Sequence, residues 1–128
     1  MLLYAVVLKG GICMLANKDL EKIMQNAEEC VLNSQAAISG YISNNNLMVS
    51  IQFMNQAFLC AKQVQSLYYN ICQHPTAFEV EEFYHQFLFL NQEFLTSIET
   101  DHGQQHSLIE LRRLEDMLQS LKSNSMLV

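Results

Sequence analysis

Two histidine-containing patterns are the first candidates for chemistry in this chain of 128 residues. Glu82 and His85 form an ExxH unit, the spacing that di-iron helical bundles use to place two metal ligands on one helix face. Such a site also draws on a second ExxH unit and two further glutamates. At 100° per residue, His85 falls about 180° from the expected core-facing side of its helix. We therefore interpret this ExxH unit as part of a solvated helix face.

The second pattern is His102, His106 and Glu110, which are spaced four residues apart. On one continuous helix this spacing would align three metal ligands. Ser107 and Glu110, however, form a capping box, which predicts that a helix begins at Ser107 and that both histidines precede it in a polar loop. We keep His102, His106 and Glu110 as weak metal candidates and expect no bound metal or cofactor.

Motifs for catalysis are absent from the sequence. It contains no glycine-rich phosphate loop, HExxH, GxSxG or CxxC pattern. The four cysteines would allow two disulfides in a secreted bundle. Each lies on or beside an apolar helical position, which favours buried thiols in a reducing cytoplasm. We therefore predict a non-enzymatic protein with no catalytic residues.

The distribution of charge is more informative. The segment from Glu79 to Asp101 holds six acidic residues and no basic one, whereas the rest of the chain holds seven of each, so this segment accounts for the net charge of −6. On a helical projection Phe78 and Phe89 fall outside the apolar arc, among the acids. An acidic, aromatic surface of this kind suits a basic amphipathic helix of a protein partner. The partner-binding candidates are Phe78, Glu82, His85, Phe89 and Glu93. A structural alternative is that the N-terminal segment covers the two phenylalanines.

Charge is scarce elsewhere. Charged residues make up 16% of the chain, against about 25% in an average globular domain. This excludes a nucleic-acid binder driven by basic charge. Between Cys30 and Phe78, Lys62 is the only charged residue, but the many amides there are incompatible with a membrane span. The amides of the second expected helix are compatible with self-association, and equally with an ordinary surface of low charge.

Helical periodicity predicts the fold. Apolar positions recur in steps of three and four from Leu20 to Tyr41, from Leu47 to Ile71, from Val80 to Ile98 and from Leu108 to Leu121. Gly40 and the polar cluster at 43–46 are expected to end the first helix. We predict one all-α domain over residues 1–128: an antiparallel, up-and-down four-helix bundle in residues 17–123 and a frayed tail in 124–128.

Residues 1–16 are expected to form an additional N-terminal segment. Gly10 and Gly11 cost a helix about 2 kcal/mol relative to alanine. An isolated β-hairpin is marginal in water. We favour a short helix or an apolar arm packed on the bundle over a hairpin.

Two short resemblances concern this N-terminal segment. The run from Val6 to Gly11 resembles the phosphorylated segment of histidine phosphotransfer domains, with Val6 in place of the phospho-accepting histidine. That resemblance implies a bundle without phosphotransfer. Residues 2–16 resemble the opening hairpin of longin domains, but the rest of the chain lacks the later strands of that family.

The sequence thus favours a cytoplasmic protein–protein interaction module, such as an adaptor, a secretion-type chaperone or a regulatory subunit. Its expected partner is a protein, with no nucleic acid, and a homo-oligomer is compatible with the sequence. The alternatives are a bundle that binds a metal or small ligand, and a phosphotransfer-like bundle without its histidine.

Overall fold

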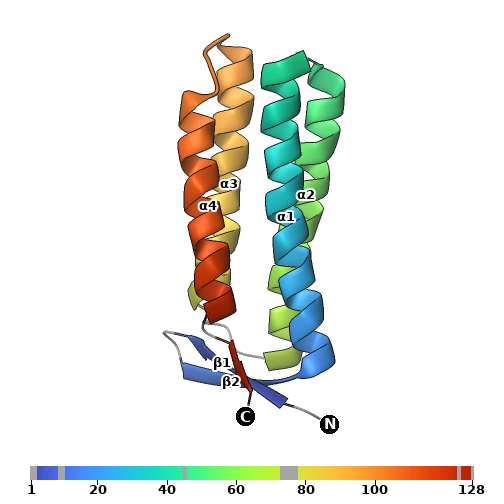
Figure 1. The fold of residues 1–128 in the computed structure, drawn as a ribbon, viewed down its shortest axis with the longest axis vertical. Coiled ribbons are helices and arrows are strands. Elements are labelled where there is room, and N and C mark those ends of the chain that lie inside the picture. The colour runs from blue at the N-terminus through green and yellow to red at the C-terminus, as the bar shows by residue number, and fades with distance from the viewer. Residues whose placement is uncertain (1–2, 9–10, 45, 73–77, 124, 128) are drawn as a thin grey trace.

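The computed structural model describes the backbone of residues 3–8, 11–44, 46–72, 78–123 and 125–127, and the side chains of residues 18–43, 46–70 and 80–123. The predicted antiparallel four-helix bundle is confirmed (Figure 1). Its helices are α1 (Asn17–Asn44), α2 (Leu47–Cys72), α3 (Phe78–Glu99) and α4 (Gln105–Ser123). Contacts join α1 to α2, α2 to α3, α3 to α4 and α1 to α4, so each helix has two neighbours around a common core.

The core combines large aromatic side chains with small ones. Phe83, Phe87 and Phe94 of α3 are fully buried. The α1–α2 pair contributes small residues to the same core, and these are Ala27, Cys30, Ser34, Ala37, Ala57, Cys60 and Ala61. Small side chains let the backbones of α1 and α2 approach each other, and the phenylalanines of α3 fill the remaining space at the density of a protein interior. Each fully buried phenylalanine contributes about 1.5–3 kcal/mol from burial.

Two aromatic contacts join α3 to the α1–α2 pair. The ring of Phe94 meets Tyr41 of α1 edge-on, at 6.1 Å between centroids and 80° between planes. The ring of Phe87 lies 6.1 Å from that of Phe58 on α2, at 54°. Both arrangements are among those that aromatic pairs prefer. Together they fix the rotation of α3 about its own axis.

A small antiparallel sheet lies at one end of the bundle (Figure 1). Strands β1 (Leu3–Leu8) and β2 (Gly11–Ala16) form a hairpin whose register pairs Leu3 with Ala16 and Leu8 with Gly11. The short helix or arm favoured for this segment was therefore wrong. The frayed tail was wrong as well, because residues 125–127 form β3 (Ser125–Leu127), which pairs with β1. A hairpin that is marginal alone gains a third strand from the opposite end of the chain, and β2 also contacts α1 and α2.

The helix ends differ from the sequence prediction at two places. Gly40 does not end α1, which continues to Asn44 because this turn packs against α2. The second helix begins as expected, with the side chain of Asn46 accepting a hydrogen bond from the N–H of Val49 at 3.2 Å. The capping box at Ser107 was wrong, since α4 begins at Gln105 and Ser107 is buried with no hydrogen-bond partner in the described part of the chain.

The reversal between α3 and α4 explains the early start of α4. The N–H of His102 donates to the carbonyl of Ser97 at 2.9 Å, and that of Asp101 to Ile98 at 3.3 Å. These two bonds, with Asp101 at φ 55°, form a Schellman motif. The motif turns the chain within a few residues, so that Gln104 already accepts the first helical hydrogen bond, from Leu108.

Among the described residues, no helix has both the length and the apolar character that crossing a membrane would require.

We predict that Gly40→Ala stabilises the protein by about 1 kcal/mol, since Gly40 lies inside α1 and glycine is about that much less favourable than alanine in a helix. The added Cβ would lie 3.5 Å from Oγ of Ser50, which is an ordinary contact. Ser39→Ala, at an exposed position of the same helix, is the control and should gain less. Denaturant unfolding measures both. Destabilisation by Gly40→Ala would show that α1 and α2 are too close there for a methyl group.

Candidate functional site

The four described partner-binding candidates share the outward face of α3. We call Glu82, His85, Phe89 and Glu93 the α3 stripe, because their steps of three and four place them on one side of the helix. Phe89 is 64% exposed, a large fraction for a phenylalanine. His85 is exposed as well, and Glu82 and Glu93 are half-buried. The side chain of Phe78 lies outside the described residues, as do the side chains of the N-terminal segment that was the alternative cover for the two phenylalanines.

A carboxylate on the α2 side of α3 organises one edge of this surface. The Glu81 carboxylate accepts hydrogen bonds from Nε2 of Gln65, at 2.9 Å, and from the hydroxyl of Tyr69, both on α2. Nε2 of His85 lies 3.5 Å from the same carboxylate, which draws the imidazole toward α2 and forms an ion pair when the ring is protonated. The hydrogen bond to Glu81, helped by burial and by the charge of that carboxylate, raises the pKa of Tyr69. Glu81 therefore joins α2 to α3 and is not free to bind a partner.

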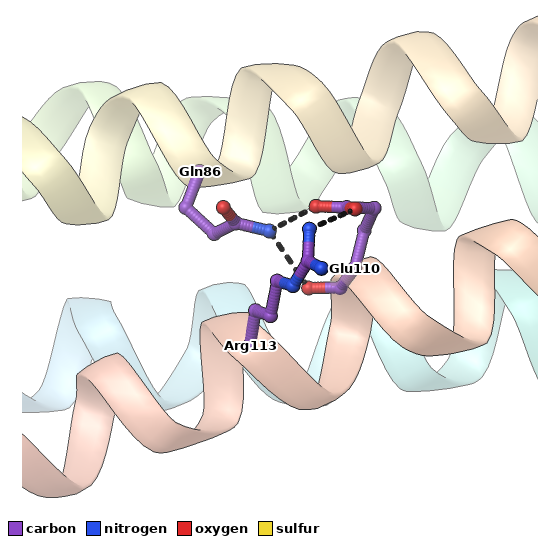
Figure 2. A network of polar contacts seen from close by, with 3 residues as sticks. All are labelled: Gln86, Glu110 and Arg113. Carbon is purple, nitrogen blue, oxygen red and sulfur yellow. Dashed lines mark hydrogen bonds and ion pairs between the residues drawn. The ribbon is translucent and has the colours of Figure 1, made fainter.

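A second polar network joins α3 to α4, on the other side of α3 (Figure 2). The buried amide of Gln86 donates from Nε2 to the backbone oxygen of Glu110, at 3.0 Å, and to its carboxylate, at 2.6 Å. Nη1 of Arg113 donates to the same carboxylate at 2.7 Å. The Glu110 side chain is 16% exposed and that of Arg113 is 62% exposed. The Glu110 carboxylate therefore links α4 to α3, and both of its oxygens already accept hydrogen bonds, one from Gln86 and one from Arg113.

The structure does not bring the three weak metal candidates together as one ligand set. His102 lies in the loop before α4, and its Nδ1 is 2.7 Å from Oγ1 of Thr100. His106 is exposed in the first turn of α4, where the sequence had placed it before the helix, and Glu110 is bound to Gln86. Nowhere in the described part of the chain do three or more histidine, cysteine or acidic side chains group as metal ligands would.

The ExxH spacing occurs twice in the chain without forming a metal site of this kind. Glu82 and His85 lie on the α3 stripe, and His85 pairs with Glu81. Glu99 and His102 share the spacing but lie on either side of the end of α3, so they do not occupy one helix face.

A hollow of about 450 Å³ lies at the end of the bundle that is opposite the sheet. Its lining comes from the end of α1, the loop between α3 and α4 and the start of α4, and includes Tyr41, Ile42, His102 and Leu108. His102 is the one metal candidate in this lining. The hollow is therefore bounded mainly by apolar and uncharged groups.

Cys30 and Cys60 are free thiols buried between α1 and α2. Burial, followed by the proximity of Cys60, raises the pKa of the Cys30 thiol well above its ordinary value of 9.0. Burial also raises the pKa of Cys60, whose Sγ lies 3.9 Å from Oε2 of Glu29. A raised pKa keeps both sulfurs protonated, and thiols in that form are poor nucleophiles. The side chains of Cys13 and Cys72 lie outside the described residues.

Sequence reasoning located the outward face of α3 but missed the contacts that border it. The role of Gln65 and Tyr69 as partners of Glu81 depends on how α2 and α3 are aligned, and no local pattern encodes that alignment. The amide of Gln86 likewise looks like any surface glutamine in the sequence, although the residue is 8% exposed. Its position beside the apolar arc of α3 was the one available signal.

Comparison with known proteins gives no relative for this chain: no family model, no curated protein and no solved structure matches it.

We predict that Gln86→Ala destabilises the protein by about 1–3 kcal/mol, because it removes both hydrogen bonds to Glu110 and leaves buried polar groups without their partner. Arg113→Ala is the control from the same network and should cost less than about 0.5 kcal/mol, since Arg113 is largely exposed. Chemical denaturation distinguishes the two. Equal losses would mean that the buried Gln86 amide contributes no more to stability than the exposed Arg113–Glu110 pair, which lies within α4.

We also predict that Cys30 resists alkylation in the folded protein and reacts readily in denaturant, because its thiol is buried and its pKa is raised. The folded pKa lies above the unfolded one, so this group's contribution to stability is complete below about pH 9 and decreases as the pH rises further. Mass spectrometry of alkylated peptides measures the first effect and denaturant unfolding from pH 8 upward the second. Cys30→Ala should reduce the loss of stability in alkali. Rapid alkylation of Cys30 in the folded protein would contradict the burial of this thiol between α1 and α2.

Proposed function

We propose that this chain is a non-enzymatic protein–protein interaction module whose α3 stripe binds a basic amphipathic helix of a partner protein. The observation that carries the proposal is Phe89, an aromatic side chain that is 64% exposed between partly exposed acids on one helix face. Large exposed aromatic residues are enriched where proteins bind other proteins. A surface phenylalanine of this kind anchors an apolar contact, and Glu82 and Glu93 select for a basic partner.

The charge distribution supports this choice of partner. The six acids between Glu79 and Asp101 provide the entire net charge of −6, and no base lies among them. Complementary charge accelerates encounter and selects among partners more than it adds affinity. Lysines or arginines flanking an apolar stripe on the partner would meet acids on both sides of Phe89. The association is therefore expected to weaken as salt is raised.

The dimensions of the stripe support a helical partner. Glu82 and Glu93 are eleven positions apart, which corresponds to about 16 Å along a helix axis. A partner helix presents its own side chains in steps of three and four residues over about three turns of that length. Glu81 of α3 accepts hydrogen bonds from α2, and Gln86 of α3 donates to Glu110 of α4, so the stripe lies on a helix that is held on both sides. A braced surface loses little conformational entropy on binding.

Adaptors, secretion-type chaperones and regulatory subunits all act by holding a segment of another protein, and the proposal covers these roles. The buried free thiols of Cys30 and Cys60 support a reducing, cytoplasmic setting. No catalytic motif in the sequence supports an enzyme.

The test uses a synthetic Lys/Leu peptide with helical amphipathic periodicity, and a Glu/Leu peptide of the same pattern. Fluorescence anisotropy with the full chain should show binding of the basic peptide only. Phe89→Ser should weaken it by at least about tenfold, the equivalent of 1.4 kcal/mol. Leu32→Ser is the matched control, because Leu32 is 60% exposed on α1, and it should bind as the unmodified chain does.

A charge variant separates specific binding from general attraction. Glu82→Gln should reduce both the affinity and its salt dependence, whereas Glu21→Gln, an exposed acid on α1, should have a smaller effect. Equal affinity for Phe89→Ser and the unmodified chain would refute the α3 stripe as the binding surface. If Phe89→Ser does weaken binding, affinity purification from the native cell with the unmodified chain and with Phe89→Ser would identify the natural partner as the protein that only the unmodified chain retains.

A further inference from the structure

The outward face of α2 carries mostly apolar and amide side chains, and Lys62, which lies three positions after Leu59 and four before Ser66, is its one charged residue. Met48 is 73% exposed and Leu59 is 60% exposed. Exposed polar but uncharged residues share their side of the helix in steps of three and four. We call this set the α2 face, and its members are Met48, Gln52, Asn55, Leu59, Gln63, Ser66 and Asn70.

Among the described residues, the hydrogen bonds that join α2 to its neighbours lie on its flanks, outside the α2 face. On one flank of α2, Gln65 and Tyr69 bond to Glu81 of α3. On the other flank, Cys60 approaches Glu29 of α1. The α2 face lies between these flanks and points away from the core, in which Met54 and Val64 are buried.

Further apolar side chains are exposed where α1 ends and α2 begins, and we call them the apolar patch. Ile42 at the end of α1, together with Leu47, Val49 and Phe53 at the start of α2, is between 39% and 55% exposed. The turn between α1 and α2 lies at the end of the bundle opposite the sheet (Figure 1). Ile42 also lines the hollow, together with Leu108. Monomeric proteins rarely expose contiguous apolar patches larger than a few hundred Å². Met48 belongs to both surfaces and joins them.

Charge decides what kind of partner this surface accepts. The chain has a net charge of −6, so two copies repel each other wherever their acidic surfaces meet. The α2 face lies within the stretch from Cys30 to Phe78, whose one charged residue is Lys62. Each copy therefore brings one charged residue, Lys62, to this surface, so the like-charge repulsion here is weaker than between two acidic surfaces. A basic partner would gain more from the α3 stripe.

The chemistry of the α2 face also suits a copy of itself. An amide side chain donates and accepts hydrogen bonds, so a row of amides is complementary to the same row turned through a twofold axis. An acidic surface lacks this property, since carboxylates only accept. Exposed apolar groups such as Met48 and Leu59 likewise pair with their own kind.

The available area sets the extent of the interface. A stable dimer buries about 800 Å² per subunit. A helix of 26 residues, the length of α2, is about 39 Å long and about 10 Å wide, so its face covers roughly 400 Å² in projection. The α2 face alone is too small, and the apolar patch at the end of the bundle must contribute.

We propose that the chain forms a twofold homodimer in which the α2 face and the adjoining apolar patch of one copy pack against the same surface of a second copy. This inference does not rest on the proposed function, because the α3 stripe lies on a different face and stays accessible in the dimer.

Sedimentation velocity of the full chain from about 1 to about 200 µM tests the proposal. We expect a concentration-dependent dimer. The double variant Met48→Glu with Leu59→Glu should remain monomeric, because like charges then oppose each other across the twofold axis. Leu32→Glu is the matched control, since Leu32 is as exposed as Leu59 but lies on α1, and it should still dimerise. Circular dichroism melting checks that each variant is folded.

A second pair of variants covers the case in which the double variant does not fold. Gln52→Glu and Asn55→Glu add charge to the α2 face without removing an apolar side chain, and each should weaken the dimer by at least about tenfold. Salt gives an independent readout. Raising the salt concentration from about 0.02 M to about 0.5 M should lower the dissociation constant of the homodimer, because salt screens the repulsion between two acidic chains.

Three results would overturn the proposal: a chain that is monomeric at every concentration, a dimer that these substitutions leave intact, and a dimer that Leu32→Glu disrupts as strongly as the double variant Met48→Glu with Leu59→Glu does. Loss of peptide binding at the α3 stripe leaves these measurements unchanged, so the two proposals can fail separately.

Discussion

The packing of the α3 phenylalanines against the small residues of the α1–α2 pair is the interaction on which the rest of the structure depends. Phe83, Phe87 and Phe94 lose essentially all contact with solvent. Because successive residues on a helix are 100° apart, burying these rings fixes which side chains of α3 face outward. The exposure of Phe89 is therefore a consequence of how the core is filled.

Polar contacts then align the helices that hydrophobic burial brings together. Burial is non-directional and tolerates small shifts along a helix axis, whereas a hydrogen bond requires specific atoms at specific distances. Glu81 on the α2 side of α3, and Gln86 on the α4 side, supply such bonds. These contacts use side chains that the sequence alone would place on the surface. The face of α3 between them is held in place from both sides.

The uneven distribution of charge along the chain gives the protein one acidic surface and one nearly uncharged surface. The α3 stripe concentrates the acidic residues around an aromatic side chain, and the α2 face is almost free of charge. At the α3 stripe, the acidic charge would attract a basic partner. At the α2 face, the scarcity of charge would minimise the repulsion of a second copy. The responses to salt therefore distinguish the two proposed associations. A protein with evenly mixed surface charge would not allow this separation.

The sequence by itself determined the four helices, the faces they bury and the distribution of charge, because these depend on spacing within a few turns of one helix. Tertiary structure decided the rest. Gly40 stays helical because α2 packs against it, and Glu110 belongs to a network only because Gln86 lies opposite. The N-terminal hairpin needs β3, more than a hundred residues away in the chain. Local periodicity carries no information about such pairings, since their free energy arises only once distant segments meet.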